Sequence, residues 1–306
     1  MLDYPSLAAL ATVVREGSFE RAARALHVTP SAVSQRVKWL EERLGGVLVV
    51  RGQPCMATAA GRLLCRHVEQ VGLLEQDLRG ALPALARAGV DSARATLRVA
   101  VNADSLGTWF IAAISRFAEA SPALLDVALD DEEHTLDWLR SGTVLAAVTA
   151  HERAVQGCSS VPLGRLRYAA VASPAFVRRH FSRGVTPATL AAAPTLRFNR
   201  KDRLQMQWMH RLCRRDIEPP THWLPSTQAF VDATLVGLGW AMNPIRLVAR
   251  ALEAGTLVEL VPGRTLDVPL YWQVTRLAVP MLAELTRAVM VAAREAMTPP
   301  ARRVPP

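Results

Sequence analysis

Apolar residues in the first part of the chain recur at the three- and four-residue spacing of amphipathic helices. The pattern predicts three helices whose inner faces are formed by Leu7, Leu10, Val13 and Val14, then Phe19, Ala22, Ala23 and Leu26, then Val33, Val37, Leu40 and Leu44. Ser18 and Thr29 are typical N-cap residues for the second and third helices, and Pro30 suits a first helical position. Because a tight turn at His27-Val28 joins these two helices, residues 18–44 are predicted to form a helix-turn-helix.

The third predicted helix carries a polar face opposite its apolar one. Ser31, Gln35 and Lys38 lie opposite Val33 at a turn of about 100° per residue. Hydroxyls, an amide and cations on an exposed helix suit the reading of base edges beside phosphates, whereas an ordinary helical hairpin with a solvated polar face is the alternative. A short strand over Val47–Val50 and a turn over Arg51–Pro54 form a basic wing, which favours DNA binding. The predicted DNA contacts are Ser18, Thr29, Pro30, Ser31, Ala32, Ser34, Gln35, Arg36, Lys38 and Arg51.

A long helix is predicted after the wing, with Thr58 as its N-cap. Its apolar residues repeat in alternating four- and three-residue steps, interrupted only by Glu75, and this predicted heptad seam consists of Leu64, Val68, Val71, Leu78 and Leu82. Such a seam indicates helix-on-helix packing, either on the helix's own domain or on a second copy of the chain. Pro83 is expected to end or kink the helix, and residues 86–95 read as a hinge.

From Leu97 onward, strands alternate with helices. The predicted strands are Leu97–Val101, Leu124–Leu129, Val144–Thr149, Leu166–Ala172, Thr195–Phe198, Trp240–Asn243, Leu257–Val261 and Leu270–Val274. The predicted helices are one capped by Asp104 or Ser105 and running through Phe117, one around Thr135–Arg140, one capped by Ser226-Thr227 and carrying Phe230, and one over Leu282–Met297. This alternation predicts an α/β domain with a parallel sheet whose faces are covered. Residues 299–306 are expected to form a disordered tail.

The composition narrows the class of protein. A net charge of +9 and a pI near 10.3 indicate an anionic partner, but residues 1–90 hold eleven Lys/Arg against eight Asp/Glu, so the surplus is not concentrated in the helix-turn-helix. No uncharged apolar run approaches the roughly 18 residues of a membrane span. The N-terminus carries Asp3 and has no basic start before an apolar segment, so no secretory signal is expected. We therefore expect a cytoplasmic protein that does not associate with a membrane.

The four cysteines are too far apart for a CxxC pair or a zinc ribbon. Cys55, Cys65, Cys158 and Cys213 are expected to be reduced thiols, with a Cys158–Cys213 redox pair as an alternative. The histidines show no metal spacing, and no cofactor or metal is expected.

About ninety N-terminal residues resemble the winged helix-turn-helix of LysR-type transcriptional regulators. The matching elements are Gly17-Ser18-Phe19, Ala22-Ala23, Leu26, Ser31-Ala32-Val33-Ser34, Leu40-Glu41, Leu44-Gly45, the wing ending in Arg51, and Thr58-Ala59-Ala60-Gly61. The wing departs from the family pattern, because Val50 stands where Phe usually precedes the Arg and Pro54-Cys55 follows. That variant, with the opening Leu2-Asp3-Tyr4, resembles the branch typified by ArgP and LysG, which regulates basic amino acid export and is also described as inhibiting chromosome replication initiation.

The resemblance extends along nearly the whole chain and implies a domain plan. It implies a winged helix-turn-helix over residues 1–58, a linker and dimerisation helix with a hinge over 59–91, an effector-binding domain over 92–298, and a tail over 299–306. The effector domain is expected to resemble a type 2 periplasmic-binding protein, with lobe I over about 92–163 and 268–298 and lobe II over about 164–267. Double-stranded promoter DNA, a second copy of the chain in a dimer or tetramer, and RNA polymerase are the implied partners.

A ligand is expected beyond the carboxyl ends of the strands, where helix N-termini also point. Between Asp126 and Asp137 the chain carries six acids and no Lys or Arg, which suits a ligand with an extra positive charge. The alternative for any one of these acids is that it complements a helix dipole and faces water. With the resemblance, the set indicates L-lysine or L-arginine as the effector. The predicted effector contacts are Asn102, Asp104, Ser105, Asp130, Asp131, Thr149, Phe198, Thr227 and Phe230.

Other classes of protein fit the sequence less well. An enzyme would need a reactive motif, and the chain has no GxSxG elbow, phosphate loop or metal spacing. A transport solute-binding protein would share the second domain but would need an export signal in place of a helix-turn-helix. A regulator of another metabolite, or a cysteine-based redox sensor, remains the alternative within the same family.

Overall fold

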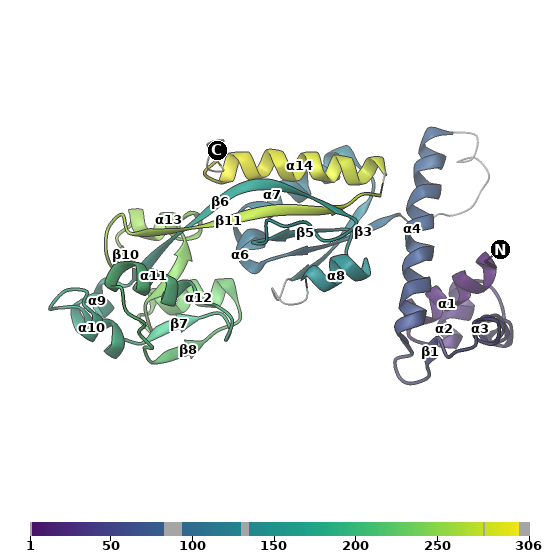
Figure 1. Cartoon of the computed structure of the whole chain (residues 1–306), viewed down its shortest axis with the longest axis horizontal. Coiled ribbons are helices and arrows are strands. Elements are labelled where there is room, and N and C mark those ends of the chain that lie inside the picture. The colour runs from purple at the N-terminus through teal and green to yellow at the C-terminus, as the bar shows by residue number, and fades with distance from the viewer. Residues whose placement is uncertain (1, 83–93, 130–134, 278, 300–306) are drawn as a thin grey trace. The chain divides into compact units, whose positions relative to one another are not determined.

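The computed structural model describes residues 2–82, 94–129, 135–277 and 279–299 (Figure 1). The chain divides into two compact units, one formed mainly by the residues up to Thr96 and one formed mainly from Leu97 onward. Within the described residues, no helix is both long and apolar enough to cross a membrane.

The N-terminal unit contains the predicted helix-turn-helix. Its helices are α1 Tyr4–Glu16, α2 Phe19–Ala25, α3 Pro30–Leu44 and α4 Ala59–Ala81, and its antiparallel strands are β1 Val49–Val50 and β2 Met56–Ala57. The predicted caps are confirmed, because the side chains of Ser18, Thr29 and Thr58 accept hydrogen bonds from first-turn backbone N–H groups. The strand expected over Val47–Val50 is shorter than predicted, and β2 was not predicted.

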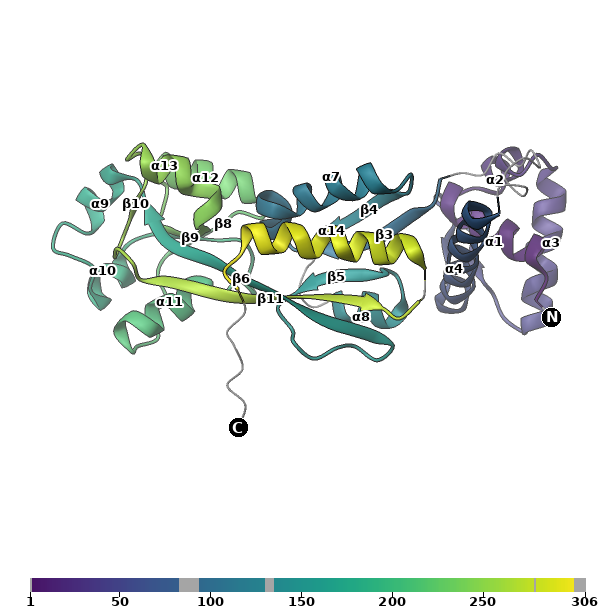
Figure 2. The same ribbon diagram turned by 90° about the horizontal axis from the view of Figure 1, so that it is seen from above.

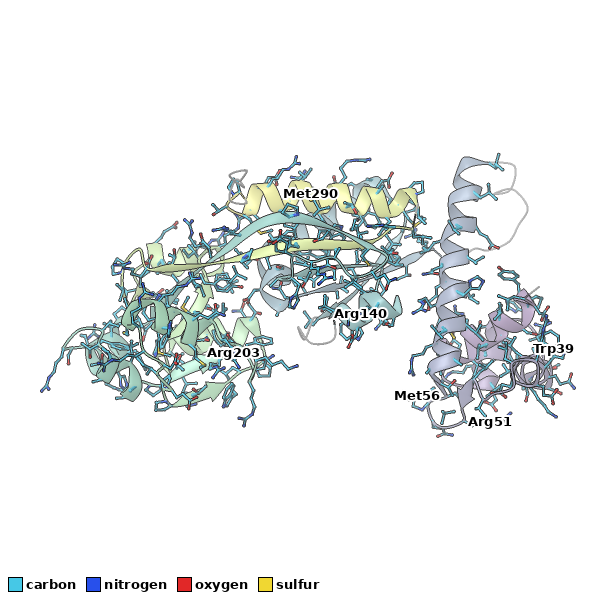
Figure 3. The ribbon with its side chains drawn as sticks, viewed as in Figure 1. Trp39, Arg51, Met56, Arg140, Arg203 and Met290 are labelled. Carbon is cyan, nitrogen blue, oxygen red and sulfur yellow. The ribbon has the colours of Figure 1, made fainter. Side chains whose placement is uncertain are left out.

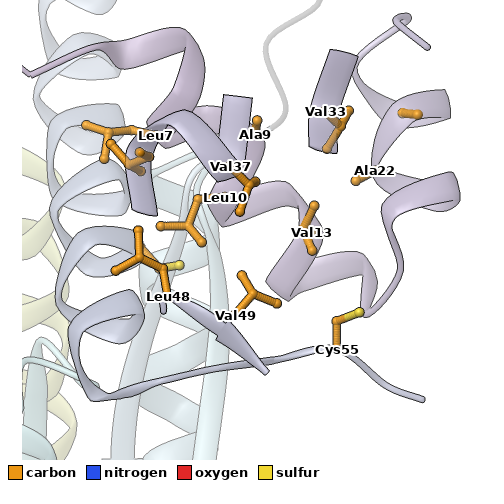
Figure 4. Close-up of a cluster of buried hydrophobic side chains, with 13 residues drawn as sticks. Leu7, Ala9, Leu10, Val13, Ala22, Val33, Val37, Leu48, Val49 and Cys55 are labelled. Atoms are coloured by element: carbon orange, nitrogen blue, oxygen red, sulfur yellow. The ribbon is translucent and has the colours of Figure 1, made fainter. Parts of the chain in front are cut away.

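One apolar cluster holds the helices and the wing together (Figure 4). Leu7, Leu10 and Val13 of α1 are fully buried against Val33 and Val37 of α3. Ala22 and Ala23 are also buried, so the two small residues let α2 approach closely, and Leu48, Val49 and Cys55 bring the wing into the same core. The apolar faces predicted from the spacing are therefore the faces that pack, with one exception: Leu44, expected on the inner face of the third helix, is about half exposed.

The predicted heptad seam on α4 is divided between two environments. Leu64 and Val68 pack against the core of their own unit, so the alternative of intradomain packing is correct for this end of the seam. Leu78 and Leu82 are about half exposed, as is Leu74. The expected break at Pro83 and most of the expected hinge lie outside the described residues.

The C-terminal unit is built on a seven-stranded sheet with the order β10-β6-β11-β5-β3-β4, in which β9 also pairs with β6. The strands are β3 Thr96–Val101, β4 Leu124–Leu129, β5 Ala146–Thr149, β6 Cys158–Ala172, β9 Ala241–Pro244, β10 Val258–Glu259 and β11 Thr265–Thr275. The expectation of a parallel sheet is wrong for most of these pairs. β3 and β5 are parallel, but β11 pairs antiparallel with both β5 and β6, because it returns along the strand that left the first half of the unit.

The helices of the C-terminal unit form two lobes around this sheet (Figures 1 and 2). Lobe I is the part around α6 Ala103–Ser105, the π-helical turn Leu106–Phe110, α7 Ile111–Ala120, α8 Thr135–Ser141 and α14 Pro280–Ala296. Lobe II is the part around α9 Pro174–His180, α10 Pro187–Ala192, α11 Leu204–Cys213, α12 Thr227–Leu235 and α13 Ile245–Glu253, with a small parallel sheet of β7 Thr195–Arg197 and β8 Thr221–Trp223. Both long strands, β6 and β11, run through the two lobes.

Side chains on both faces of the sheet fix the helices of lobe I. The indole Nε1 of Trp272 on β11 donates to Thr286 Oγ1 of α14 at 3.1 Å, and Arg116 of α7 pairs with Glu295 of α14 at 2.8 Å. On the other face, Leu139 of α8 packs with Ala100 and Ala147 of the sheet. The sheet is thus covered on both faces, as predicted.

The first helix of lobe I begins differently from the prediction. Asn102 is its N-cap, because its Oδ1 accepts a hydrogen bond from the backbone N–H of Ser105 at 3.0 Å. The expectation that Asp104 or Ser105 caps this helix is therefore wrong. The difference matters for the site, because the Asp104 carboxylate is not used as a cap.

Gly61 allows α4 to begin against the wing. A Cβ at this position would lie 2.1 Å from the carbonyl oxygen of Leu48, a backbone atom that cannot move aside alone. We predict that Gly61→Ala destabilises the N-terminal unit by about 1–3 kcal/mol and weakens DNA binding. Gly72→Ala on the same helix is the matched control, since nothing lies within 4 Å of its added Cβ. Because alanine favours a helix more than glycine does, this variant should gain up to about 1 kcal/mol in the free energy of unfolding. Equal unfolding temperatures of the two variants in calorimetry would contradict this prediction.

Candidate functional site

The exposed face of α3 carries the side chains predicted to read DNA. Ser31, Gln35 and Lys38 are exposed, whereas Val33 and Val37 of the same helix are buried. Lys38 pairs with Glu42 at 3.6 Å, but both side chains are largely exposed, so this ion pair is weak. Ala32, Ser34 and Arg36 are partly exposed and flank the face. The helix therefore presents a polar surface rather than packing it away.

Two predicted DNA contacts are also the helix caps. The Ser18 hydroxyl accepts from the backbone N–H groups of Glu20 and Arg21 and donates to the Glu20 carboxylate at 2.6 Å. The Thr29 hydroxyl accepts from the backbone N–H of Ala32 at 3.2 Å. These bonds fix the start of each helix, so both side chains help to set the orientation of the helix-turn-helix. Pro30 is the first residue of α3, as predicted.

The wing is fixed to the helix-turn-helix at several points. The Glu41 carboxylate of α3 accepts from the backbone N–H groups of Leu48 and Val49 at 2.8 and 3.3 Å. The Cys55 N–H donates to the Gly17 carbonyl at 2.9 Å. The Arg51 guanidinium lies 5.2 Å from the centre of the Phe19 ring, and Figure 3 shows where it lies in the wing. These contacts hold the wing against the helix-turn-helix.

The C-terminal unit contains a cavity of about 320 Å³ where the two lobes meet the long strands. Polar and charged lining residues come from both lobes: Asn102 and Asp104 from lobe I, and Asn199, Lys201, Asp202, Arg203, Gln207, Thr227 and Asn243 from lobe II. Tyr168 lines it from β6, and the apolar lining includes Phe198, Leu204, Phe230, Met242, Val268 and Leu270. The cavity is large enough for a small metabolite, and it offers charges of both signs beside apolar surface.

Asp104 is a cavity residue with a perturbed carboxyl group. Burial raises the pKa of its carboxyl to about 6, and the nearby charge of Asp202 acts in the same direction. The Tyr168 hydroxyl donates to Asp104 Oδ2 at 2.7 Å, which lowers the pKa, and the neighbouring Thr227 hydroxyl also favours the carboxylate. A carboxylate that is costly to ionise, at the edge of a cavity, favours a cationic ligand that would replace the missing solvent.

Asp202 holds the loop that forms the lobe II side of the cavity. Its Oδ2 accepts from the Phe198 N–H at 3.0 Å and from Gln205 Nε2 at 3.2 Å, and its Oδ1 accepts from the Leu204 N–H at 3.1 Å. Asn199 Oδ1 accepts from the N–H groups of Lys201 and Asp202 at 2.9 and 3.0 Å. These bonds shape residues 198–204 into a compact turn that brings Lys201 and Arg203 to the lining.

The structure separates the predicted effector contacts into three groups. Asn102, Asp104, Phe198, Thr227 and Phe230 line the cavity. Ser105 is fully buried and Thr149 nearly so, the latter accepting from the His151 N–H at 3.1 Å, and neither is among the lining residues. Asp130 and Asp131 lie outside the described residues.

Sequence reasoning missed several cavity residues. Tyr168 lies within a buried strand, where an aromatic residue reads as core. The segment from Arg197 to Arg203 has a detectable signal, because it places four cations and one acid at the end of a short strand and directly after it. Asp202 itself gave no sequence signal, since its role depends on the folded turn.

No disulfide joins the four cysteines, all of which lie in the described part of the chain. All four are free thiols, and burial raises the pKa of Cys65 to about 11 and raises that of Cys158 as well. Raised pKa values disfavour the thiolate that redox chemistry needs. In the described part of the chain, no group of three His, Cys, Asp or Glu side chains is placed to hold a metal ion.

Comparison with known proteins relates both units to one family. Residues 5–62 match the bacterial regulatory helix-turn-helix protein model of the lysR family, and residues 91–297 match the LysR substrate binding domain. The HTH-type transcriptional regulator LysG of Mycobacterium bovis is 47% identical over 294 residues, which cover 95% of this chain and 94% of that protein.

Solved structures show the same architecture. The crystal structure of ArgP from Mycobacterium tuberculosis superposes with a TM-score of 0.81 at 46% identity, covering 98% of this chain and all of that one. A full-length LysG from Corynebacterium glutamicum with bound effector Arg superposes with a TM-score of 0.71 at 39% identity, covering 97% of this chain and all of that one. The similarity therefore extends over both compact units of the chain.

Proposed function

The chain belongs to the LysR family of transcriptional regulators, and we propose that it senses L-lysine or L-arginine and controls a gene of basic amino acid export or metabolism. The observation that carries this proposal is the partly buried Asp104 carboxylate, whose pKa is raised, in a cavity lined by both lobes. The relative from Corynebacterium glutamicum, whose structure holds arginine, supports the same class of effector. A regulator rather than an enzyme is the role that the named relatives support.

The charges around the cavity suit a zwitterion that carries one additional cation. Asp104, with Asp202 nearby, provides the negative side, and a ligand ammonium or guanidinium would relieve the cost of its ionisation. Lys201 and Arg203 provide a positive side for the α-carboxylate, supported by the polar groups of Asn102 and Thr227. The aliphatic stem of the ligand would lie against the rings lining the cavity, Phe198 and Phe230.

Promoter DNA is the proposed partner of the N-terminal unit. Ser31, Gln35 and neighbouring side chains of α3 would enter the major groove, with Arg51 at the backbone near the minor groove. We further propose that two copies associate through the exposed leucines of α4, and that the assembly acts on RNA polymerase at the promoter.

Substitutions in the N-terminal unit test the DNA-reading surface. Gln35→Ala should reduce discrimination between promoter variants by about 1–3 kcal/mol, because a bidentate base contact would be lost. Arg51→Ala should weaken all sequences equally and reduce the steepness of the salt dependence, because it removes a phosphate contact. Arg116→Ala in the C-terminal unit is a control for the loss of an exposed arginine. If gel shifts over a salt series gave all three variants the wild-type behaviour, the surface would be misassigned.

Calorimetry on the full-length chain tests the effector. L-arginine and L-lysine should bind about 10- to 100-fold more tightly than citrulline and norleucine, because only they form a charge-assisted bond to a carboxylate. Below pH 6 their affinity should fall by up to about tenfold per pH unit, since Asp104, with a pKa near 6, must then lose a proton on binding. Asp104→Asn should abolish both effects.

Asp126→Asn is the matched control for the effector test, because this exposed acid of lobe I pairs with Arg98 and does not line the cavity. It should bind arginine as the wild type does. Equal binding of citrulline and arginine, or no binding of either, would contradict the basic amino acid proposal and leave the family membership intact.

The oligomer has its own test. Leu74→Asp with Leu78→Asp places two charges on the exposed side of α4, and in a helix–helix interface they would be buried without partners. The double variant should sediment as a smaller species than the wild type. Val50→Asp, at a similarly exposed apolar position in the wing, should leave the sedimentation unchanged. An unchanged oligomer in the double variant would place the interface elsewhere.

A further inference from the structure

We propose that Arg197 and Trp223 are positioning residues for the effector, which hold the loop of residues 198–203 in the conformation that lines the cavity. The inference rests on the proposed function of the cavity as an amino acid site. Trp223 is not a lining residue of the cavity, and 39% of its surface is exposed. Its effect on the ligand is therefore exerted through Arg197 and the loop.

The two residues are neighbours across the small sheet of lobe II. β7 and β8 pair in parallel with Arg197 opposite Trp223, and the Leu224 N–H donates to the Arg197 carbonyl at 3.0 Å. This register places the Arg197 guanidinium 4.8 Å from the centre of the Trp223 ring. Each strand has three residues, so the backbone pairing alone anchors only the start of the loop.

The Arg197 guanidinium reaches from the ring into the loop. Its Nε donates to the Asp202 carbonyl at 2.8 Å, its Nη2 donates to the same oxygen, and Nη2 also lies 3.4 Å from the Arg200 carbonyl. The Arg200 guanidinium also contacts the Trp223 indole, at 5.2 Å from the ring centre. One tryptophan ring thus holds two arginines that lie at the two ends of a four-residue segment.

We call Trp223 with Arg197 and Arg200 the clamp. The loop that the clamp holds carries much of the cavity's polar surface. Phe198, Asn199, Lys201, Asp202 and Arg203 all line the cavity. The Asp202 carboxylate is already occupied by two backbone N–H groups and by Gln205, so the loop has an internal frame and the clamp holds its outer side. Loss of the ring frees the Arg197 guanidinium and lets the backbone at Asp202 move. The lining residues then lose their preorganised positions, which weakens binding.

Titration of L-arginine into the full-length chain by calorimetry tests the clamp. Trp223→Ala should weaken arginine binding by about tenfold, and Trp223→Phe, which keeps an aromatic face for the guanidinium, should restore most of the affinity. Arg197→Lys should resemble Trp223→Ala, because an ammonium does not form the planar fork to both carbonyl groups. Leu238→Ala, an exposed apolar truncation in the same lobe, should bind as the wild type does.

The pH profile separates positioning from general loosening of the lobe. Asp202 raises the pKa of Asp104. If the loop of Trp223→Ala moves Asp202 away, the pKa of Asp104 should fall, and the acid limb, which is the decrease of arginine affinity at low pH, should shift to lower pH. Trp223→Phe should keep the wild-type limb. If Trp223→Ala does not fold, as judged by its thermal transition, Arg197→Lys decides the question by the same two readouts.

The outcomes distinguish the clamp from the function on which it rests. If Trp223→Ala and Arg197→Lys both bound arginine with the affinity and the acid limb of the wild type, the clamp alone would be overturned. Weakened binding in Trp223→Ala that phenylalanine does not restore, with an unshifted pH limb, would also overturn it. An absence of arginine binding in the wild type would overturn the proposed effector and the clamp with it.

Discussion

The antiparallel pairing of β6 with β11 is the constraint on which the architecture of the effector unit depends. Residues from Cys158 to Ala169 pair with residues from Thr265 to Thr275, so two long strands cross both lobes within one sheet. The chain leaves lobe I along β6 and returns along β11, and the lobes are therefore joined at two adjacent points. The cavity lies at this crossing, with Tyr168 from one long strand and Val268 and Leu270 from the other in its lining.

The same crossing explains why Asp104 has unusual chemistry. Tyr168 is fixed in the buried strand, so its hydroxyl can donate to a carboxylate that arrives on the first helix of lobe I. The hydroxyl groups of Tyr168 and Thr227 together do not compensate for desolvation, and the pKa of Asp104 remains about 6. Above that pH the folded protein carries an ionised, partly buried carboxylate, which costs stability, and a ligand cation beside it would offset this cost. The carboxylate would thus link ligand binding to the protonation of one side chain between the two lobes.

The local signals in the sequence predicted most of the elements and part of the site. Ser18, Thr29 and Thr58 act within three residues of themselves, so the caps of α2, α3 and α4 were readable. The antiparallel pairing of β11 with β6 could not be predicted, because an alternation of strands and helices does not determine the relative direction of two strands that are about 100 residues apart in sequence. Asn102 replaced Asp104 as the cap, and only the folded backbone distinguishes them. Tyr168 and Asp202 acquire their roles through contacts with distant or turned segments, which no local pattern encodes.

Proton release on binding of L-arginine tests the central claim, that Asp104 is the carboxylate which receives the ligand's cation. Calorimetry at one pH in buffers of different ionisation enthalpy counts the protons exchanged. Near pH 5.5, where Asp104 is largely protonated in the free protein, the account predicts release of a substantial fraction of one proton, falling to almost none at pH 8. Proton uptake at pH 5.5, or an exchange that does not change between the two pH values, would contradict it.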